Sequence, residues 1–448
     1  MAQVSIEQVA LALAMGPRSA QALCERLSIS QPTLSRLLSG MGNRVVRIRQ
    51  GRSVLYALLD SSRGFSEVPV YRVDTEGRLE RLGVLYPVRD AGYVMQEVDG
   101  QSLHSEGLPW WIADMRPQGF MGRAYAHHHA AALGLPGSLK DWSDTHAVRA
   151  LLAHGHDVTG NLLLGDMARE RFLDAPKSEP IAFDDRAHVY ARLSTAAVNG
   201  DETWSSAGGE QPKFTAYVQM PDGARHVLVK FTVADDNPVT ERWRDLLLCE
   251  HHALQTLRDG HVDASATNVV ESGNQRFLEV ERFDRVGLRG RRGLLSLESI
   301  DSEFAGKGTS PWPEVTRALA ADGHITQQAH NSATLLYAYG CLIGNTDMHH
   351  GNLAFVNTNG RPYELAPAFD MLPMTFQPRA SGTIGNTVNS VSLHPDVPAS
   401  TWRTALGLAH VFVSRARADD RLSAAFQPCL DALEAHLVAM GSKINLLV

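Results

Sequence analysis

The spacing of apolar residues at the start of the chain changes from a helical to a strand-like period. Apolar side chains three to four residues apart predict helices at residues 6–14, 20–27 and 31–38. Alternating apolar and polar residues then predict two strands, at residues 44–49 and 53–58, joined by a short turn. Three helices followed by a strand pair are therefore the first expected unit of the chain.

This order of elements resembles a winged helix-turn-helix domain that covers residues 1–63. In such a domain the third helix enters the major groove of DNA, and the strand pair, or wing, touches phosphates. The resemblance assigns DNA contacts to four residues of the third helix and three of the wing: Gln31, Thr33, Ser35, Arg36, Arg47, Arg49 and Arg52. The alternative is a winged helix used for dimerisation or protein contact.

The charge distribution favours a polyanionic partner for this head. Residues 1–63 contain eight arginines and three acidic residues, a net charge of +5. The whole chain carries -7, so the remaining 385 residues carry -12. A basic head on an acidic body is typical of a nucleic-acid-binding unit. We expect the head to bind duplex DNA as a separable module.

Composition indicates a soluble globular protein. Hydrophobic residues make up 44% of the chain and charged residues 20%, and no apolar run of about 18 residues could span a membrane. The N-terminus lacks the basic and apolar pattern of a signal peptide. Four scattered cysteines without CxxC spacing are expected to be reduced core thiols. These features predict a cytoplasmic protein that makes no membrane contact.

The clearest chemical signal is the polar loop that follows an apolar helical run ending at Ile343. Asp347 and Asn352 stand five residues apart in this loop. Protein kinases use that spacing for the acid that accepts the substrate hydroxyl proton and the amide that ligates magnesium. Asp370 follows eighteen residues after Asn352, beyond a strand and a turn that can bring it back to the loop. Each of these residues taken alone could instead cap a helix or a turn.

A lysine in an apolar strand is the second signal. Burying Lys230 is costly unless an anion meets it, and ATP phosphates are such an anion. Glu250, in the next predicted helix, can point inward to Lys230. Upstream, Gly208 and Gly209 allow backbone amides to approach phosphate, although a Gly-Gly pair more often marks a turn. The alternative for Lys230 is an edge lysine that extends into solvent.

These motifs together resemble those of the HipA-like serine/threonine kinases, the toxins of bacterial toxin–antitoxin pairs. The matching segments are residues 205–213, 229–231, 280–285, 343–352 and 367–371. The added winged helix-turn-helix makes the chain similar to YjjJ-like members of the family. One departure is Gly351, which stands where the family usually has a basic residue.

The resemblance implies a fold and a reaction. The fold class is α+β multidomain: the head, a small β-rich subdomain at residues 66–107, a kinase N-lobe with its ATP-binding loop at 108–280, and a helical kinase C-lobe with the catalytic loop at 281–448. The reaction is phosphorylation of a protein with ATP and Mg²⁺ as cofactors. Competing interpretations are a DNA-binding transcriptional regulator whose kinase-like body senses a nucleotide or a partner, and a small-molecule kinase.

The resemblance also implies residue roles and partners. Asp347 is the catalytic base, and Asn352 and Asp370 bind the metal. The implied ATP-binding residues are Gly208, Gly209, Lys213, Lys230, Glu281 and Phe283. Ser205 or Ser206 matches the autophosphorylated serine of the family. The expected partners are DNA, a HipB-like antitoxin and a protein substrate, for which an aminoacyl-tRNA synthetase is one candidate.

Overall fold

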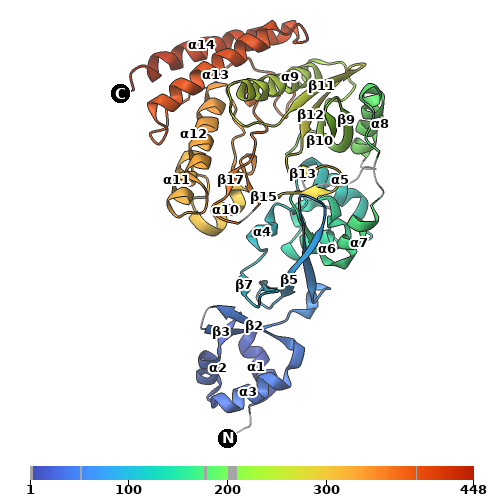
Figure 1. Cartoon of the computed structure of the whole chain (residues 1–448), viewed down its shortest axis with the longest axis vertical. Coiled ribbons are helices and arrows are strands. Elements are labelled where there is room, and N and C mark those ends of the chain that lie inside the picture. Colours follow the sequence, from blue (N-terminus) through green and yellow to red (C-terminus); the bar gives the residue numbers. More distant parts are fainter. Residues whose placement is uncertain are drawn as a thin grey trace.

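The structure is a computed structural model that describes residues 4–50, 53–175, 179–199, 209–358, 360–389 and 391–447. The molecule is elongated, with the N-terminal head at one end and the last two helices at the other (Figure 1). Within the described ranges, none of the helices has the length and apolar character needed to cross a membrane.

The head contains three helices and a three-stranded antiparallel sheet of order β1-β3-β2. Ser5 starts the first helix with a capping box, in which its side chain and that of Gln8 satisfy each other's backbone amides. The elements are α1 (Ile6–Leu13), β1 (Arg18–Ser19), α2 (Ala20–Leu27), α3 (Gln31–Gly40), β2 (Val45–Gln50) and β3 (Ser53–Leu58). The three helices, β2 and β3 end within two residues of the ends predicted from the sequence, whereas β1 was not predicted.

The head also shares a core with the unit that follows it. Val46 and Ile48, on β2, are buried against Val88 and Val94 of the next unit. Cutting the chain after the head would expose these apolar side chains to water, at about 25 cal/mol per Å². That the head is a separable module stays a prediction, and this shared core counts against it.

The middle unit, residues 68–174, is a five-stranded antiparallel sheet covered by helices. Its strand order is β7-β6-β5-β4-β8. The elements are β4 (Val68–Val73), β5 (Leu79–Pro87), β6 (Tyr93–Glu97), β7 (Ser102–Ser105), α4 (Trp110–Ala113), α5 (Gly119–His129), α6 (Asp144–His154), β8 (Leu162–Leu164) and α7 (Gly165–Asp174). One core joins Val70 and Leu85 of the sheet to Ile112 and Leu151 of the helices. The boundary expected at residue 107 thus falls inside this unit.

A four-stranded antiparallel sheet of order β11-β12-β10-β9 follows. Its elements are α8 (Arg186–Asn199), β9 (Lys213–Met220), β10 (Gly223–Phe231), α9 (Pro238–Asp259), β11 (Thr267–Ser272) and β12 (Gln275–Glu281). Asn237 caps α9, and Pro238 occupies its first turn, where a missing amide proton costs nothing. The register of β9 and β10 places Lys213 directly opposite Lys230.

The C-terminal part is mainly helical and contains the largest core of the described residues. Its elements are β13 (Arg285–Val286), β14 (Gly290–Arg291), β15 (Gly293–Ser296), α10 (Leu297–Ile300), α11 (Trp312–Ala321), α12 (Gln327–Leu342), β16 (Ala354–Asn357), β17 (Glu364–Leu365), α13 (Ala399–Ala418) and α14 (Gln427–Ile444). Residues 343–353 connect α12 to β16, which pairs with β15 and β17. A rigid helix and a sheet thus hold both ends of the loop that contains Asp347.

Candidate functional site

A cavity of about 480 Å³ opens where the four-stranded sheet, the loop after α12 and the middle unit meet. Its apolar wall includes Leu228, Val280, Phe283 and Phe369. Its polar lining includes Lys213, Lys230, Glu250, Glu281, Asn352 and Asp370. A neighbouring cavity of about 730 Å³ shares both lysines and Asp370 and adds Asp347. Every described residue with an expected catalytic, metal or ATP role therefore lines at least one of these two adjoining cavities.

Lys230 is the electrostatic centre of this space. Its Nζ donates hydrogen bonds to both carboxylate oxygens of Glu250, at 2.7 and 2.8 Å, and forms an ion pair with Asp370. Glu250 thus points inward from α9, as predicted. Burial alone would lower the pKa of Lys230, but the Asp370 and Glu250 carboxylates outweigh it and raise that pKa. Lys230 therefore stays protonated at any physiological pH.

Lys213 faces the same two carboxylates from the neighbouring strand. It is 3% exposed. Burial lowers the pKa of Lys213 to about 8, since the attraction of Asp370 offsets only part of this effect and Lys230 adds to it. Like charges directly opposite each other on paired strands are destabilising unless an anion lies between them. Two buried lysines next to an open cavity therefore suit a ligand with several negative charges.

The loop after α12 is fixed by its own hydrogen bonds. Asn345 donates from Nδ2 to the Asp370 carbonyl at 3.2 Å, and its Oδ1 accepts the Asp347 amide at 3.0 Å. Asn352 donates from Nδ2 to the Asp347 carbonyl at 2.8 Å. The Asp347 carboxylate is left exposed to solvent. Partial burial nevertheless raises its pKa, an effect that His349 opposes.

The two histidines of the loop bind backbone groups. His349 accepts the Gly351 amide on Nδ1 at 3.0 Å. His350 donates from Nε2 to the Ser310 carbonyl at 2.7 Å. Over the described ranges no group of three or more His, Cys, Asp and Glu side chains could hold a metal ion.

The linker, residues 281–284, forms the wall beside the apolar part of the cavity. The Glu281 carboxylate accepts a hydrogen bond from Arg225 at 2.7 Å, so this side chain is already engaged. The ring of Phe283 lies 5.8 Å from that of Phe369, centroid to centroid. A flat apolar group would fit against these rings.

The remaining predicted residues are two serines, Gly208 and the DNA-contact residues of the head. Ser205, Ser206, Gly208 and Arg52 fall outside the described residues. The other DNA-contact residues belong to the head and are remote in sequence from the cavity. Of these, Gln31, Ser35 and Arg36 are exposed on α3, Thr33 is half-buried, and Arg47 and Arg49 are exposed on β2.

Sequence reasoning missed the contribution of the middle unit to the cavity. Asp114, Arg116, Gln118 and Asp144 line it, and Arg116 forms an ion pair with Asp144 at 2.9 Å. These residues lie 61 to 91 positions upstream of the first kinase-like motif, which begins at residue 205. No short motif connects them to the site, so single-sequence reasoning had no signal to use.

Comparison with known proteins identifies relatives over nearly the whole chain. Residues 65–173 match the family model described as YjjJ-like toxin, middle domain, and residues 205–435 match that of the HipA-like C-terminal domain. Toxin YjjJ of Escherichia coli is 40% identical over 434 residues, which are 96% of this chain and 97% of that protein.

A solved structure supports the fold. In the complex of HipA, HipB and operator DNA from Shewanella oneidensis, one chain matches with a TM-score of 0.52 at 14% identity. The match covers 84% of this chain and 97% of that one. The fold expected for the body, mixed α+β and HipA-like, is therefore confirmed, and the chain belongs to the HipA-like toxin family, within its YjjJ-like branch.

Proposed function

We propose that this toxin is a serine/threonine protein kinase that uses ATP and Mg²⁺. One observation carries the proposal: the buried Lys230, held by Glu250 and Asp370, borders a space that also contains Asp347 and Asn352. A kinase needs a lysine on the phosphates, a carboxylate for the metal and a second carboxylate for the acceptor hydroxyl. A protein that only senses nucleotide has no need of the last of these.

The residues fit magnesium-bound ATP. Mg²⁺ prefers oxygen ligands and is usually held by one or two carboxylates together with substrate phosphates. Asp370 and Asn352 would supply the protein ligands, which accounts for the lack of an all-protein metal cluster in the described residues. When bound, the ion would neutralise part of the phosphate charge. Lys213 and Lys230 would hold the phosphates, and the wall formed by Leu228, Phe283 and Phe369 would take the adenine.

Asp347 is the proposed proton acceptor. Its carboxylate is exposed next to the cavity, where an acceptor serine or threonine can approach. The hydrogen bond from Asn352 to the Asp347 carbonyl fixes the distance between base and metal ligand. Correct positioning of this kind accounts for much of the catalytic power of a phosphoryl-transfer enzyme.

Regulation and partners are proposed from the family. Ser205 or Ser206 would be autophosphorylated, and the added charge would repel ATP from the adjoining loop. HipB forms a complex with HipA in the Shewanella oneidensis structure, and a HipB-like antitoxin is the proposed protein partner here. The acceptor protein, with aminoacyl-tRNA synthetases as one candidate class, is open to direct test.

The head is proposed to be a winged helix-turn-helix that binds DNA. Its element order and the sheet β1-β3-β2 support this assignment. The exposed residues Gln31, Ser35 and Arg36 on α3 suit base contacts, and Arg47 and Arg49 suit phosphate contacts.

The kinase proposal is tested by incubating the full chain with labelled ATP and Mg²⁺ and mapping phosphorylated residues, in the toxin and in added cytosolic proteins, by mass spectrometry. Asp347→Asn should reduce transfer by roughly 10²- to 10⁴-fold with nearly unchanged ATP binding, because only the proton acceptor is lost. Asp322→Asn, on an exposed turn after α11, is the matched control and should match the wild type. Transfer by Asp347→Asn at the wild-type rate would disprove the assignment.

A further inference from the structure

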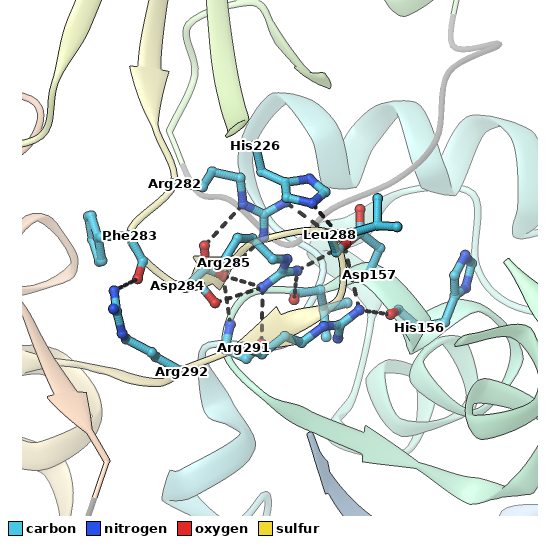
Figure 2. A network of polar contacts seen from close by, with 12 residues as sticks. His156, Asp157, His226, Arg282, Phe283, Asp284, Arg285, Leu288, Arg291 and Arg292 are labelled. Carbon is cyan, nitrogen blue, oxygen red and sulfur yellow. Dashed lines mark hydrogen bonds and ion pairs between the residues drawn. The ribbon is translucent and has the colours of Figure 1, made fainter. Parts of the chain in front are cut away.

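The linker is clamped by a network of charges that comes from the middle unit (Figure 2). Asp157, just after α6, places one carboxylate oxygen 2.9 Å from Arg285, 3.8 Å from Arg291 and 3.9 Å from Arg282. The three arginines lie in or just after the linker, more than 120 residues further along the chain. A single carboxylate of the middle unit therefore faces three guanidinium groups of the C-terminal part.

A second carboxylate, Asp284 of the linker itself, closes the network. It accepts hydrogen bonds from Arg282 at 3.0 and 3.1 Å and from Arg285 at 2.6 Å. It also accepts the Gly160 amide at 3.1 Å. A linker side chain thus forms a hydrogen bond with the backbone of the middle unit.

Backbone carbonyls of the middle unit accept further hydrogen bonds from the arginines of the network. Arg285 donates to Val158 at 2.7 Å and to Gly160 at 3.1 Å. Arg291 donates to the His156 carbonyl at 2.5 Å (Figure 2). Planar guanidinium groups with several fixed acceptors hold their neighbours in one geometry, because any shift would break several bonds together.

The arginines of the network are buried, whereas the Asp157 side chain is 36% exposed, and positive charge exceeds negative charge. The side chains of Arg282, Arg285 and Arg291 are 8%, 3% and 5% exposed. Burial would raise the pKa of Asp157, but the three arginines lower it to about 2. Three positive charges therefore share two negative ones, and removing Asp157 would leave the three buried guanidinium groups with Asp284 as the one carboxylate of the network.

This network lies directly behind the cavity. Arg282, Phe283 and Asp284 line the cavity, as does Thr159 of the middle unit. The Arg282 amide also donates to the His226 carbonyl on β10 at 2.9 Å. The contacts of Arg282 and Asp284 therefore fix the linker against both the four-stranded sheet and the middle unit.

The middle unit holds the opposite wall of the cavity as well. The Phe120 amide, at the start of α5, donates to the Gly209 carbonyl at 2.9 Å. Gly119 has a left-handed backbone with φ of +60°, and a Cβ there would lie 2.4 Å from that carbonyl oxygen. Only glycine permits this close approach. Gly209 lines both cavities beside Lys213.

We propose that the middle unit is an integral part of the nucleotide site, with Asp157 as the positioning residue for the linker and Gly119 as the positioning residue for the phosphate-side wall at Gly209. The inference rests on the proposed function, since it assumes that the cavity takes ATP. Asp157 lines neither cavity, and Gly119 borders the second cavity but has no side chain with which to contact a ligand. Both are expected to act on ground-state binding rather than on phosphoryl transfer itself, so their loss should raise KM for ATP much more than it lowers kcat.

The test compares Mg-ATP binding and kinetics for the full-length wild type, Asp157→Asn and Asp166→Asn. Asp157→Asn is expected to raise Kd and KM for ATP by roughly 10-fold or more while kcat changes less than about threefold. Asp166→Asn makes the same chemical change in the middle unit, on α7, where the carboxylate accepts an exposed hydrogen bond from Tyr71. This control should keep the wild-type Kd.

Gly119→Ala provides a second variant, because Asp157→Asn could also lower stability. Thermal unfolding is followed for each protein, and affinities are compared among folded samples only. Weaker ATP binding by folded Gly119→Ala supports the inference even if Asp157→Asn does not fold. Wild-type affinity in every folded variant overturns the inference but not the proposed function. A wild type that does not bind Mg-ATP refutes the proposed function and the inference with it.

Discussion

Positive charge gathers in two regions of this toxin, and the two are built in opposite ways. Lys213 and Lys230 are 3% and 5% exposed and lie beside Glu250 and Asp370. Two of the head's arginines proposed to meet DNA, Arg47 and Arg49, are exposed on β2. Both sets are proposed to meet phosphate, but only the lysines are held in place before the phosphate arrives.

The difference follows from the cost of removing a charge from water. A buried lysine needs carboxylate partners to remain charged, and the interaction is strong because little water screens it. An exposed arginine needs no partner, and at physiological salt its field decays over about 8 Å. The cavity is therefore suited to one tightly positioned polyphosphate, and the head to a reversible contact that salt weakens.

The largest expected effect comes from removing the central buried cation. Lys230→Met should lower phosphoryl transfer by about 10³-fold, since it removes the main phosphate contact. It should also destabilise the fold by about 3–5 kcal/mol, because Glu250 is left buried without its partner. Initial rates and thermal unfolding measure the two effects.

A double variant separates the effect of Lys230→Met on phosphoryl transfer from its effect on stability. Adding Glu250→Gln to Lys230→Met should recover part of the lost stability, because the uncompensated carboxylate is gone, but none of the lost activity. If Lys230→Met alone retained wild-type transfer, the cavity would not be a phosphate site and the contrast with the head would disappear.

An intermediate effect is expected from pH. Lys213 faces Asp370, Lys230, Glu250 and Glu210, and burial lowers its pKa to about 8. Phosphate favours the protonated amine. At a pH where Lys213 of the free protein is deprotonated, ATP binding must therefore be accompanied by protonation of Lys213. ATP affinity should therefore be constant below pH 7 and fall about tenfold between pH 7 and 9.

Lys213→Arg is the matched control for this prediction, because a guanidinium stays charged throughout that range. It should flatten the pH dependence of the Kd for ATP between pH 7 and 9. Isothermal titration in buffers of different ionisation enthalpy should detect proton uptake in the wild type near pH 8. An equally steep pH dependence in Lys213→Arg would assign the titration to another group.

Local spacing explains how far the sequence could predict this site. Asp347 and Asn352 lie in one loop, and Lys230 stands out because its strand is otherwise apolar, so short segments contain the signal. A single strand and turn between Asn352 and Asp370 were enough to predict that Asp370 lies near the loop. The inward direction of Glu250 followed from its place among leucines on one helix, and the structure confirms it.

The interfaces between units could not be predicted in this way. Asp157 and Arg285 are 128 residues apart, and nothing near either residue indicates its partner. The alternation in β2 correctly predicts that one face of the strand is buried. It does not show that Val46 and Ile48 pack against Val88 and Val94 of the middle unit instead of the helices of the head.

The smallest expected effects belong to the head, and the shared core requires that they be measured on the full chain. Arg47→Ala or Arg49→Ala should weaken binding to all duplexes by a few-fold and reduce the slope of log K against log salt by about 0.9 each, since each removes one phosphate contact. Arg36→Ala should instead erase preference among sequences, because a bidentate base contact discriminates by roughly 1–3 kcal/mol. Arg72→Ala, in the middle unit and paired with Glu80, is the control and should leave the slope unchanged. Salt titrations on a mixed pool of duplexes measure both quantities. If the full chain binds no duplex even at low salt, the exposed arginines serve protein contact. The buried lysines would then be the only one of the two compared sets that binds phosphate.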